Sequence, residues 1–203
     1  VVEVAEPSMH EPVSDLRRVL EELEFEWGLT ELECDPHVLM ALQGALRNGQ
    51  WQVTVAVFRE REIVAIWPGY HETALGMAFD IGSTTIAAHL VDLASGEALA
   101  SAGRMNPQIR FGEDLMSRVS YVMMHPGAEQ QMCEAVRTAV AELIVEVCAE
   151  AEQNSDNILD CTFVGNPIMH HLLLGLSPVE LGGAPFALAT DSAVTVSAQS
   201  LGL

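Results

Sequence analysis

The sequence predicts an α/β protein made of two units, a small α+β unit followed by a unit built on a mixed sheet. Residues 1–72 carry 14 acidic residues against 5 arginines and show the patterns of two amphipathic helices and a hairpin. From Gly76 onward the pattern changes to three strands, two helices, a strand and a further helix. We therefore expect one domain over residues 1–72 and a second over residues 73–203.

The first unit is expected to hold two capped helices and a hairpin. Ser14 can cap a helix that Gly28 stops, and Asp35 can cap a second one that ends near Asn48. Alternating residues over 51–57, a charged turn and the apolar residues 63–67 predict a hairpin. The apolar positions of the first helix are Leu16, Val19, Leu20, Leu23 and Trp27. The unit shows no catalytic constellation, so we expect a scaffold or a docking surface.

The second unit is expected to begin with three consecutive antiparallel strands, the third ending near Arg104. A helix over about residues 112–125 and a longer one follow, and the longer one has apolar residues at a spacing of three to four. A strand over residues 159–164 then leads into a short helix that ends at Gly175. The apolar stripe of the long helix consists of Met132, Val136, Val140, Leu143, Val147 and Ala151. This stripe indicates core packing.

The turn between the first two of these strands is the strongest functional signal. Gly82 permits a close approach of the backbone, and Ser83, Thr84 and Thr85 can donate hydrogen bonds to an anion. Asp80 lies at the mouth of the turn, where a carboxylate beside a polyphosphate needs a divalent cation between them, usually through water. The pattern predicts a phosphate loop with a Mg²⁺ site at Asp80. The alternative is an ordinary hairpin turn.

Composition excludes several kinds of chemistry. The formal net charge is -20 and all nine basic residues are arginine, so no lysine can bind a nucleotide phosphate, form a Schiff base or act as a base. This acidity argues against nucleic acid and anionic membranes as partners. No window approaches the roughly 20 consecutive apolar residues of a membrane span, and no signal peptide is recognisable.

The cysteines and the chain ends carry two further expectations. The sequence contains four cysteines and no C-x-x-C pair, so it shows no signature of a zinc site or of an iron–sulfur cluster; they are Cys34, Cys133, Cys148 and Cys161. Buried thiols in a reducing compartment are expected, and hence a cytoplasmic protein. The chain begins at a valine and stops without a closing element, so we expect it to be part of a longer protein.

Two polar runs after the third strand could belong to a site. Asn106 and Gln108 flank a proline that fixes the local backbone, which suits either amides presented into a cleft or plain turn chemistry. Asp114 and Arg118 share a helix face at i and i+4, where an intrahelical ion pair competes with an active-site role.

The second strand-to-helix junction could also contact an anion. Gly165 and Asn166 precede a proline at a helix start, where Asn166 can cap the helix and free amides can bind phosphate. His170 and His171 lie about 100 degrees apart on a helix, so both cannot reach one metal ion. We expect one of them to face the cleft.

Together these runs resemble a known family. The order of strands and helices is similar to the ribonuclease-H-like half of the actin, Hsp70 and sugar kinase superfamily (ASKHA). The runs at residues 80–85, 106–108, 111–118, 164–175 and 184–186 resemble more closely the ATP-dependent reductive activators of corrinoid proteins. Members of that family have a ferredoxin domain, a linker, a middle domain and a C-terminal ATPase domain. The resemblance covers most of residues 76–203, while residues 14–67 resemble the family's middle domain more loosely.

The resemblance implies a function and its parts. The parent would use an upstream 2Fe-2S cluster, ATP and Mg²⁺ to reduce the Co(II) corrinoid of a methyl-carrier protein to Co(I). Partners would be that carrier protein and, as an option, a second copy of the chain, with no nucleic acid and no membrane. Residues 1–72 would be the middle or docking domain, and residues 73–203 the N-terminal part of an actin-like ATPase domain. Candidate catalytic residues are Asp80 and Asp114, and candidate cofactor-binding residues are Gly82, Ser83, Thr84, Thr85, Asn106, Gln108, Gly165, Asn166 and His170.

Only one phosphate loop is present, so this chain alone is expected to bind ATP poorly. Two other classes stay open. A small-molecule kinase of the same superfamily would need a carboxylate base, for which Asp114 is the first candidate. A non-catalytic interaction module would use the acidic residues 1–72 as its docking surface.

Overall fold

The computed structural model describes residues 1–10 and 12–203. Within them the chain separates into two compact units, Val1–Thr73 and Ala74–Leu203. Each unit has its own cluster of buried apolar side chains, so each is considered by itself.

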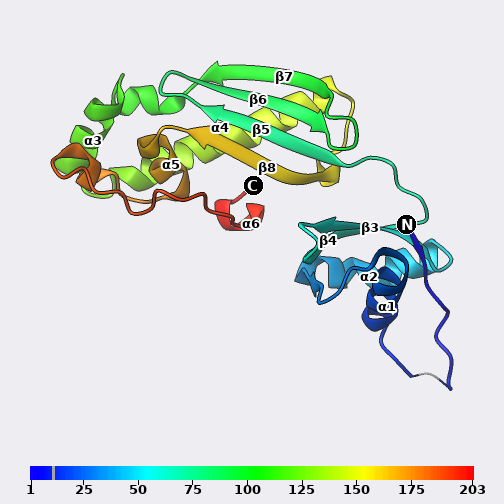
Figure 1. The fold of residues 1–203 in the computed structure, drawn as a ribbon. Helices are drawn as coiled ribbons and strands as arrows, with labels where there is room; N and C mark the ends of the chain where they lie inside the picture. The colour runs from blue at the N-terminus through cyan, green and yellow to red at the C-terminus, as the bar shows by residue number, and fades with distance from the viewer. Residues whose placement is uncertain (11) are drawn as a thin grey trace. The chain divides into compact units, whose positions relative to one another are not determined.

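The first unit is a four-stranded sheet with two helices, coloured blue to cyan in Figure 1. Its strand order is β1-β3-β4-β2, and only β2 runs parallel to its neighbour β4. The elements are β1 (Val2–Glu3), α1 (Asp15–Trp27), β2 (Glu33–Cys34), α2 (Pro36–Asn48), β3 (Gln52–Phe58) and β4 (Glu62–Pro68). The predicted helices and hairpin are confirmed. The two-residue strands β1 and β2 are too short to show an alternating pattern and were not predicted.

The predicted helix caps of this unit are confirmed. The Ser14 hydroxyl accepts the N–H of Arg17 at 3.3 Å, and Gly28 ends α1 in the left-handed conformation. The Asp35 carboxylate accepts the N–H of His37 at 2.7 Å at the start of α2. Local capping chemistry therefore sets both helix starts.

Trp27, the last of the apolar positions at helical spacing in the first helix, is not buried. Its side chain is 61% exposed, whereas Val19 and Leu23 on the same helix are buried. Trp27 is the last residue of α1, one turn beyond Leu23, the last residue of this helix in the apolar cluster. Helical spacing gave the correct face but not the point at which the core ends.

The second unit is a mixed sheet with helices (Figure 1). Its strand order is β7-β6-β5-β8, with β8 parallel to β5 and the other pairs antiparallel. The strands are β5 (Leu75–Ile81), β6 (Thr85–Asp92), β7 (Ala98–Met105) and β8 (Ile158–Gly165). Between and after them lie η1 (Pro107–Phe111), α3 (Leu115–Met124), α4 (Ala128–Glu150), η2 (Ser155–Asn157), α5 (Pro167–Leu174), η3 (Val179–Gly182) and α6 (Ala198–Leu201). This is the ribonuclease-H-like order expected from the sequence.

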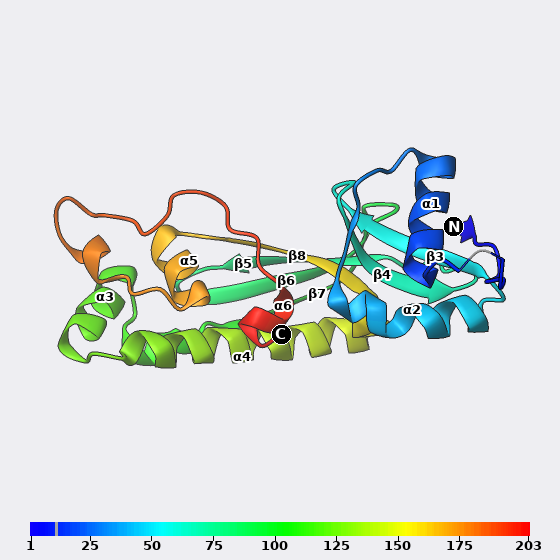
Figure 2. The ribbon, with the colours of Figure 1, turned by 90° about the horizontal axis from the view of Figure 1, so that it is seen from below.

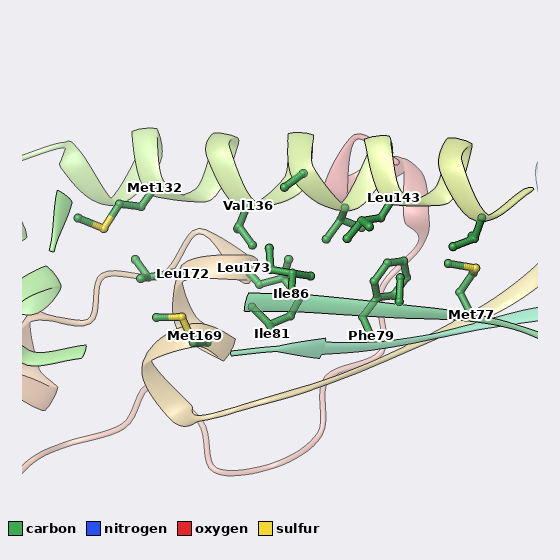
Figure 3. Close-up of a cluster of buried hydrophobic side chains, with 14 of the residues drawn as sticks. Met77, Phe79, Ile81, Ile86, Met132, Val136, Leu143, Met169, Leu172 and Leu173 are labelled. Atoms are coloured by element: carbon green, nitrogen blue, oxygen red, sulfur yellow. The ribbon is translucent and has the colours of Figure 1, made fainter. Parts of the chain in front are cut away.

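The long helix α4 packs along the sheet of this unit (Figure 2). Val136 and Leu143 of α4 point toward Ile86 and Phe79 of the strands, as Figure 3 shows, and all four are at most 1% exposed. The predicted stripe is therefore core. Within the described residues, no helix combines the length and the apolar character needed to cross a bilayer.

Alternation along β5 determines where its polar side chain lies. Phe79 and Ile81 are buried beneath α4, and the side chain of Asp80 between them is exposed. Because β5 and β8 are parallel, with Ile81 opposite Gly165, the loop after β5 and the turn after β8 leave the sheet at the same edge.

Candidate functional site

The loop between β5 and β6 has a tightly constrained backbone. The N–H of Gly82 donates to the carbonyl of Thr85 at 3.0 Å, and the N–H of Asn106 donates to the carbonyl of Thr84 at 2.7 Å. A Cβ at position 82 would lie 2.7 Å from the carbonyl oxygen of Thr85, which explains the glycine. Ser83 is half-buried, whereas Thr84 and Thr85 are exposed. The loop thus presents hydroxyl groups on a fixed backbone.

Asp80 lies two residues before this loop, with an exposed side chain. Its register neighbours are Ala87 on β6 and Val164 on β8. In the described part of the chain its carboxylate has no hydrogen-bond or ion-pair partner, so both oxygens are available to a hydrated cation. The described residues include no cluster of three His, Cys, Asp or Glu side chains able to hold a metal ion by themselves.

Of the two alternatives for Asn106 and Gln108, amides presented into a cleft or turn chemistry, the first is wrong, because both residues are fully buried. The Asn106 Oδ1 accepts the N–H of Gln108 at 2.9 Å, and its Nδ2 donates to the carbonyl of Gly82 at 2.8 Å. The Gln108 Nε2 donates to the carbonyl of Met132 at 2.9 Å. The two amides support the loop and η1 from inside the domain.

The ion pair predicted between Asp114 and Arg118 is absent. The Asp114 carboxylate accepts the N–H of Ser117 at 2.7 Å and caps α3. Its pKa is lowered from the ordinary value by the backbone and hydroxyl hydrogen bonds of Ser117, with a small contribution from Arg118. Arg118 instead turns inward and is fully buried.

The contact of Arg118 with the loop after β5 was not predicted from the sequence. The Arg118 Nη2 donates to the carbonyl of Ser83, and its Nε donates to the carbonyl of Gly112 at 3.0 Å. A signal was present in the sequence: Arg118 lies at the spacing of the apolar residues Val119 and Val122, on the buried face of α3.

The turn after β8 is capped by its own asparagine. The Asn166 Oδ1 accepts the N–H of Ile168 at 2.8 Å and of Met169 at 3.4 Å, while Gly165 is exposed. The side-chain oxygen of Asn166 is therefore occupied by the helix, and the backbone of Gly165 is the exposed part of this turn.

The two adjacent histidines of α5 differ in their surroundings. His171 is buried, with Nδ1 2.7 Å from the carbonyl of Pro167 and Nε2 accepting the N–H of Ala189 at 3.1 Å. In this arrangement Nδ1 donates to the carbonyl and Nε2 accepts the amide, which holds the ring in place. His170 is half-buried and meets His171 edge-on, with ring planes 80° apart. His171 is a structural core histidine, and His170 is the one of the pair left with a partly open ring.

Two surface hollows lie along α4. One of about 650 Å³ is lined by Arg104, Arg110 and Thr138 among others, and one of about 510 Å³ by Cys133 and Arg137 among others. Neither includes a residue of the loop after β5. The sequence-predicted residues that the fold brings to one sheet edge are therefore those of the loop, Asp80, Asn106 and the turn after β8, while Asp114 belongs to a helix cap.

Comparison with known proteins assigns the family. The family model described as the RACo middle region matches residues 75–203, and that described as the RACo linker region matches residues 1–73. The chain belongs to the RACo family. In the family's own terms its first unit is the linker region and its second unit the middle region.

The relatives of this RACo family chain include one curated protein and one solved structure. It is 40% identical over 111 residues to the "Corrinoid activation enzyme RamQ" of Eubacterium limosum, which covers 55% of this chain and 19% of that protein. A solved "Reductive activator for corrinoid,iron-sulfur protein" matches 100% of this chain with a TM-score of 0.85 and 30% identity. That match covers 33% of the solved chain, so this chain spans a third or less of both relatives.

Proposed function

We propose that this chain is part of an ATP-dependent activator that returns the Co(II) corrinoid of a methyl-carrier protein to Co(I). The main observation that supports this proposal is the loop after β5, which has exposed hydroxyls on a fixed backbone and an exposed carboxylate at Asp80. The names of the two relatives, a corrinoid activation enzyme and a reductive activator of a corrinoid protein, support the same role.

ATP would be held at the loop by its polyphosphate tail. The N–H groups and hydroxyls of Ser83 and Thr84 would bind phosphate oxygens, and Asp80 would orient the water shell of Mg²⁺. Bound ATP would supply the free energy for an electron transfer that is unfavourable at ordinary ferredoxin potentials. The electron would come from a 2Fe-2S cluster in another part of the protein, because the four free cysteines of this chain are dispersed over both units.

The kinase alternative has less support from the site. Its candidate base, Asp114, accepts hydrogen bonds from Ser117 that lower its pKa, and a carboxylate stabilised as the anion is a weaker base. Phosphorylation of any sugar in a panel by the intact protein would support the kinase alternative instead.

The first unit has the features of a docking surface for the carrier protein. It is strongly acidic, and Phe25, Trp27 and Met40 are 86%, 61% and 79% exposed on its helices. In the intact protein, Phe25→Ser should raise the KM for the carrier protein while leaving ATP hydrolysis without carrier unchanged. An unchanged KM for the carrier protein would contradict the docking role of this surface.

The main test is Mg-ATP-driven Co(I) formation by the intact protein, followed by visible absorption of the corrinoid. Asp80→Asn should slow the ATP-dependent rate by about tenfold or more. Asp160→Asn is the matched control, since Asp160 is an exposed aspartate on the neighbouring strand β8, four residues from Val164, the register neighbour of Asp80. Equal rates for Asp80→Asn and the unmodified protein would contradict the proposed site.

A further inference from the structure

Two consecutive carbonyl groups of the loop after β5 point into the protein. The Nδ2 of Asn106 donates to the carbonyl of Gly82 at 2.8 Å, and the Nη2 of Arg118 donates to the carbonyl of Ser83. Asn106 and Arg118 are both 0% exposed. Two successive peptide groups are therefore held from inside the domain by buried side chains.

The orientation of these carbonyls determines that of the next amides. In a trans peptide the C=O of one residue and the N–H of the following residue point in opposite directions. With the carbonyls of Gly82 and Ser83 directed inward, the N–H groups of Ser83 and Thr84 point away from the core. Neither N–H has an acceptor among residues 1–10 and 12–203. Two adjacent free N–H groups form a concavity that suits an anion.

A buried, charged guanidinium such as that of Arg118 is a costly hydrogen-bond donor for a purely structural role. Its other acceptors are neutral: the carbonyl of Gly112 at 3.0 Å, and the Gln108 Oε1 and Met169 Sδ, each 3.2 Å from Nη1. No carboxylate in the described part of the chain pairs with it. Burial lowers the pKa of the Arg118 guanidinium, and the charge of Asp114 acts in the opposite direction. A buried cation without a counter-ion is costly, which points to an anion that arrives from outside.

We infer that Arg118 is a positioning residue for the polyphosphate loop: by holding the Ser83 carbonyl it directs the Thr84 N–H toward the ligand. Asn106 does the same for the Ser83 N–H through the Gly82 carbonyl. The positive charge of Arg118 behind the loop adds a favourable field for the anion. This inference rests on the proposed function, because it takes a polyphosphate as the ligand of the loop.

The test uses the ¹⁵N-labelled chain of 203 residues and NMR, which detects weak binding. Tripolyphosphate with Mg²⁺ is titrated while the amide resonances of Ser83 and Thr84 are followed. Arg118→Met should weaken binding by at least about tenfold, and Arg118→Lys by less, since a lysine keeps the charge but not the forked donors. Arg137→Met is the matched control, because Arg137 also donates to a backbone carbonyl, that of Leu173 at 2.9 Å, in the same unit.

Stability alone cannot produce the predicted result. A merely structural arginine would lower the free energy of unfolding and leave the affinity of the folded molecules unchanged. The resonances of the ligand-free protein give a second readout: Arg118→Met should move those of Ser83 and Thr84, and leave those of Ala94 and Ser95 in place. Unmoved loop amides, or equal affinities for Arg118→Met and the unmodified chain, would overturn the inference and leave the proposed function standing.

The two hypotheses fail in distinguishable ways. Absence of saturable shifts at Ser83 and Thr84 in the unmodified chain would count against the proposed function, while the ligand-free comparison still decides the role of Arg118. If Arg118→Met does not fold, Arg118→Lys and hydrogen exchange in the unmodified chain decide it. The amides of Ser83 and Thr84 should exchange fast although their order parameters are those of rigid backbone, and protected amides would overturn the inference.

Discussion

The two hairpin turns at the edges of the β5–β6–β7 meander satisfy their backbone groups in opposite ways. In the turn between β6 and β7, the Oδ1 of Asp92 accepts the N–H of Ala94 at 2.9 Å and of Ser95 at 2.7 Å. In the loop between β5 and β6, buried side chains hold the carbonyls of Gly82 and Ser83, and the amides are left free.

The difference shows what separates a closed turn from a candidate anion site. Both turns carry exposed hydroxyl residues, so composition alone does not distinguish them. The turn after β6 supplies its own anion, the Asp92 carboxylate, to its amides. The loop after β5 directs no carboxylate of its own at its amides, which leaves that place to a ligand.

The largest effect is expected from removing the inner support of the loop. Asn106→Ala deletes both the cap of η1 and the donor to the Gly82 carbonyl, leaving a buried acceptor without a partner. We expect a loss of about 3 kcal/mol in the free energy of unfolding. Asn154→Ala is the control, since exposed Asn154 caps η2 by the same type of bond, at 3.0 Å, and should cost about 1 kcal/mol. Equal losses in urea titrations would show that Asn106 is only a cap.

A smaller effect is expected from adding a methyl group to each turn. Gly82→Ala places a Cβ 2.7 Å from the carbonyl oxygen of Thr85, which should cost about 2 kcal/mol and abolish polyphosphate binding. Gly96→Ala meets no atom within 4 Å, and its φ of +77° should cost about 1 kcal/mol with binding unchanged. Thermal melts and anion titrations of the two variants check this pair. Loss of polyphosphate binding in Gly96→Ala would contradict the expected difference between the two turns.

Removing one hydroxyl from each turn should affect ligand binding in one turn and stability in the other. In the described residues Thr84 has an exposed side chain without a hydrogen-bond partner, so Thr84→Ala should weaken polyphosphate binding and change stability by less than about 0.5 kcal/mol. The Ser95 hydroxyl donates to Asp92 at 3.0 Å and accepts the N–H of Glu97 at 3.2 Å. Ser95→Ala should therefore lower stability slightly and leave binding intact. The comparison fails if Thr84→Ala binds tripolyphosphate as well as the unmodified chain does.

The smallest effect concerns acid. Hydrogen bonds from the backbone and hydroxyl of Ser95 lower the pKa of Asp92 below its ordinary value of 3.8. The unfolded state then binds more protons than the folded state, so this contribution to stability is complete above pH 3.8 and is lost as the pH falls through the lower folded pKa. Asp92→Asn, which keeps the acceptor oxygen but cannot titrate, should flatten the acid limb of the stability curve. An unchanged acid limb would mean that the turn gains nothing from the charge.

The sequence was most informative where structure is local. Ser14 and Asp35 predicted helix starts through capping chemistry, and the alternation over residues 51–57 predicted the hairpin. Trp27 was misplaced because spacing identifies a face without saying how far the core extends. The two-residue strands β1 and β2 owe their existence to pairing with β3 and β4, which no local pattern reveals.

The candidate site was predicted in part for the same reason. The loop residues are contiguous with β5, so one motif identified them together. The role of Arg118 depends on a contact with Ser83 across 35 positions of the chain, and that of Asn106 on one with Gly82 across 24. The helical spacing of Asp114 and Arg118 favoured an ion pair, but the buried acceptors at the loop outcompeted the exposed carboxylate.

The loop after β5 is proposed to bind the polyphosphate of a nucleotide. The most direct test of this proposal is a titration of the ¹⁵N-labelled chain with Mg-ATP, in which the amides of Ser83 and Thr84 are compared with those of Ala94 and Ser95. Weak but saturable shifts are expected at the first pair, and stationary resonances at the second. Shifts confined to the turn after β6, or to the hollow lined by Arg104 and Thr138, with Ser83 and Thr84 unmoved, would contradict it.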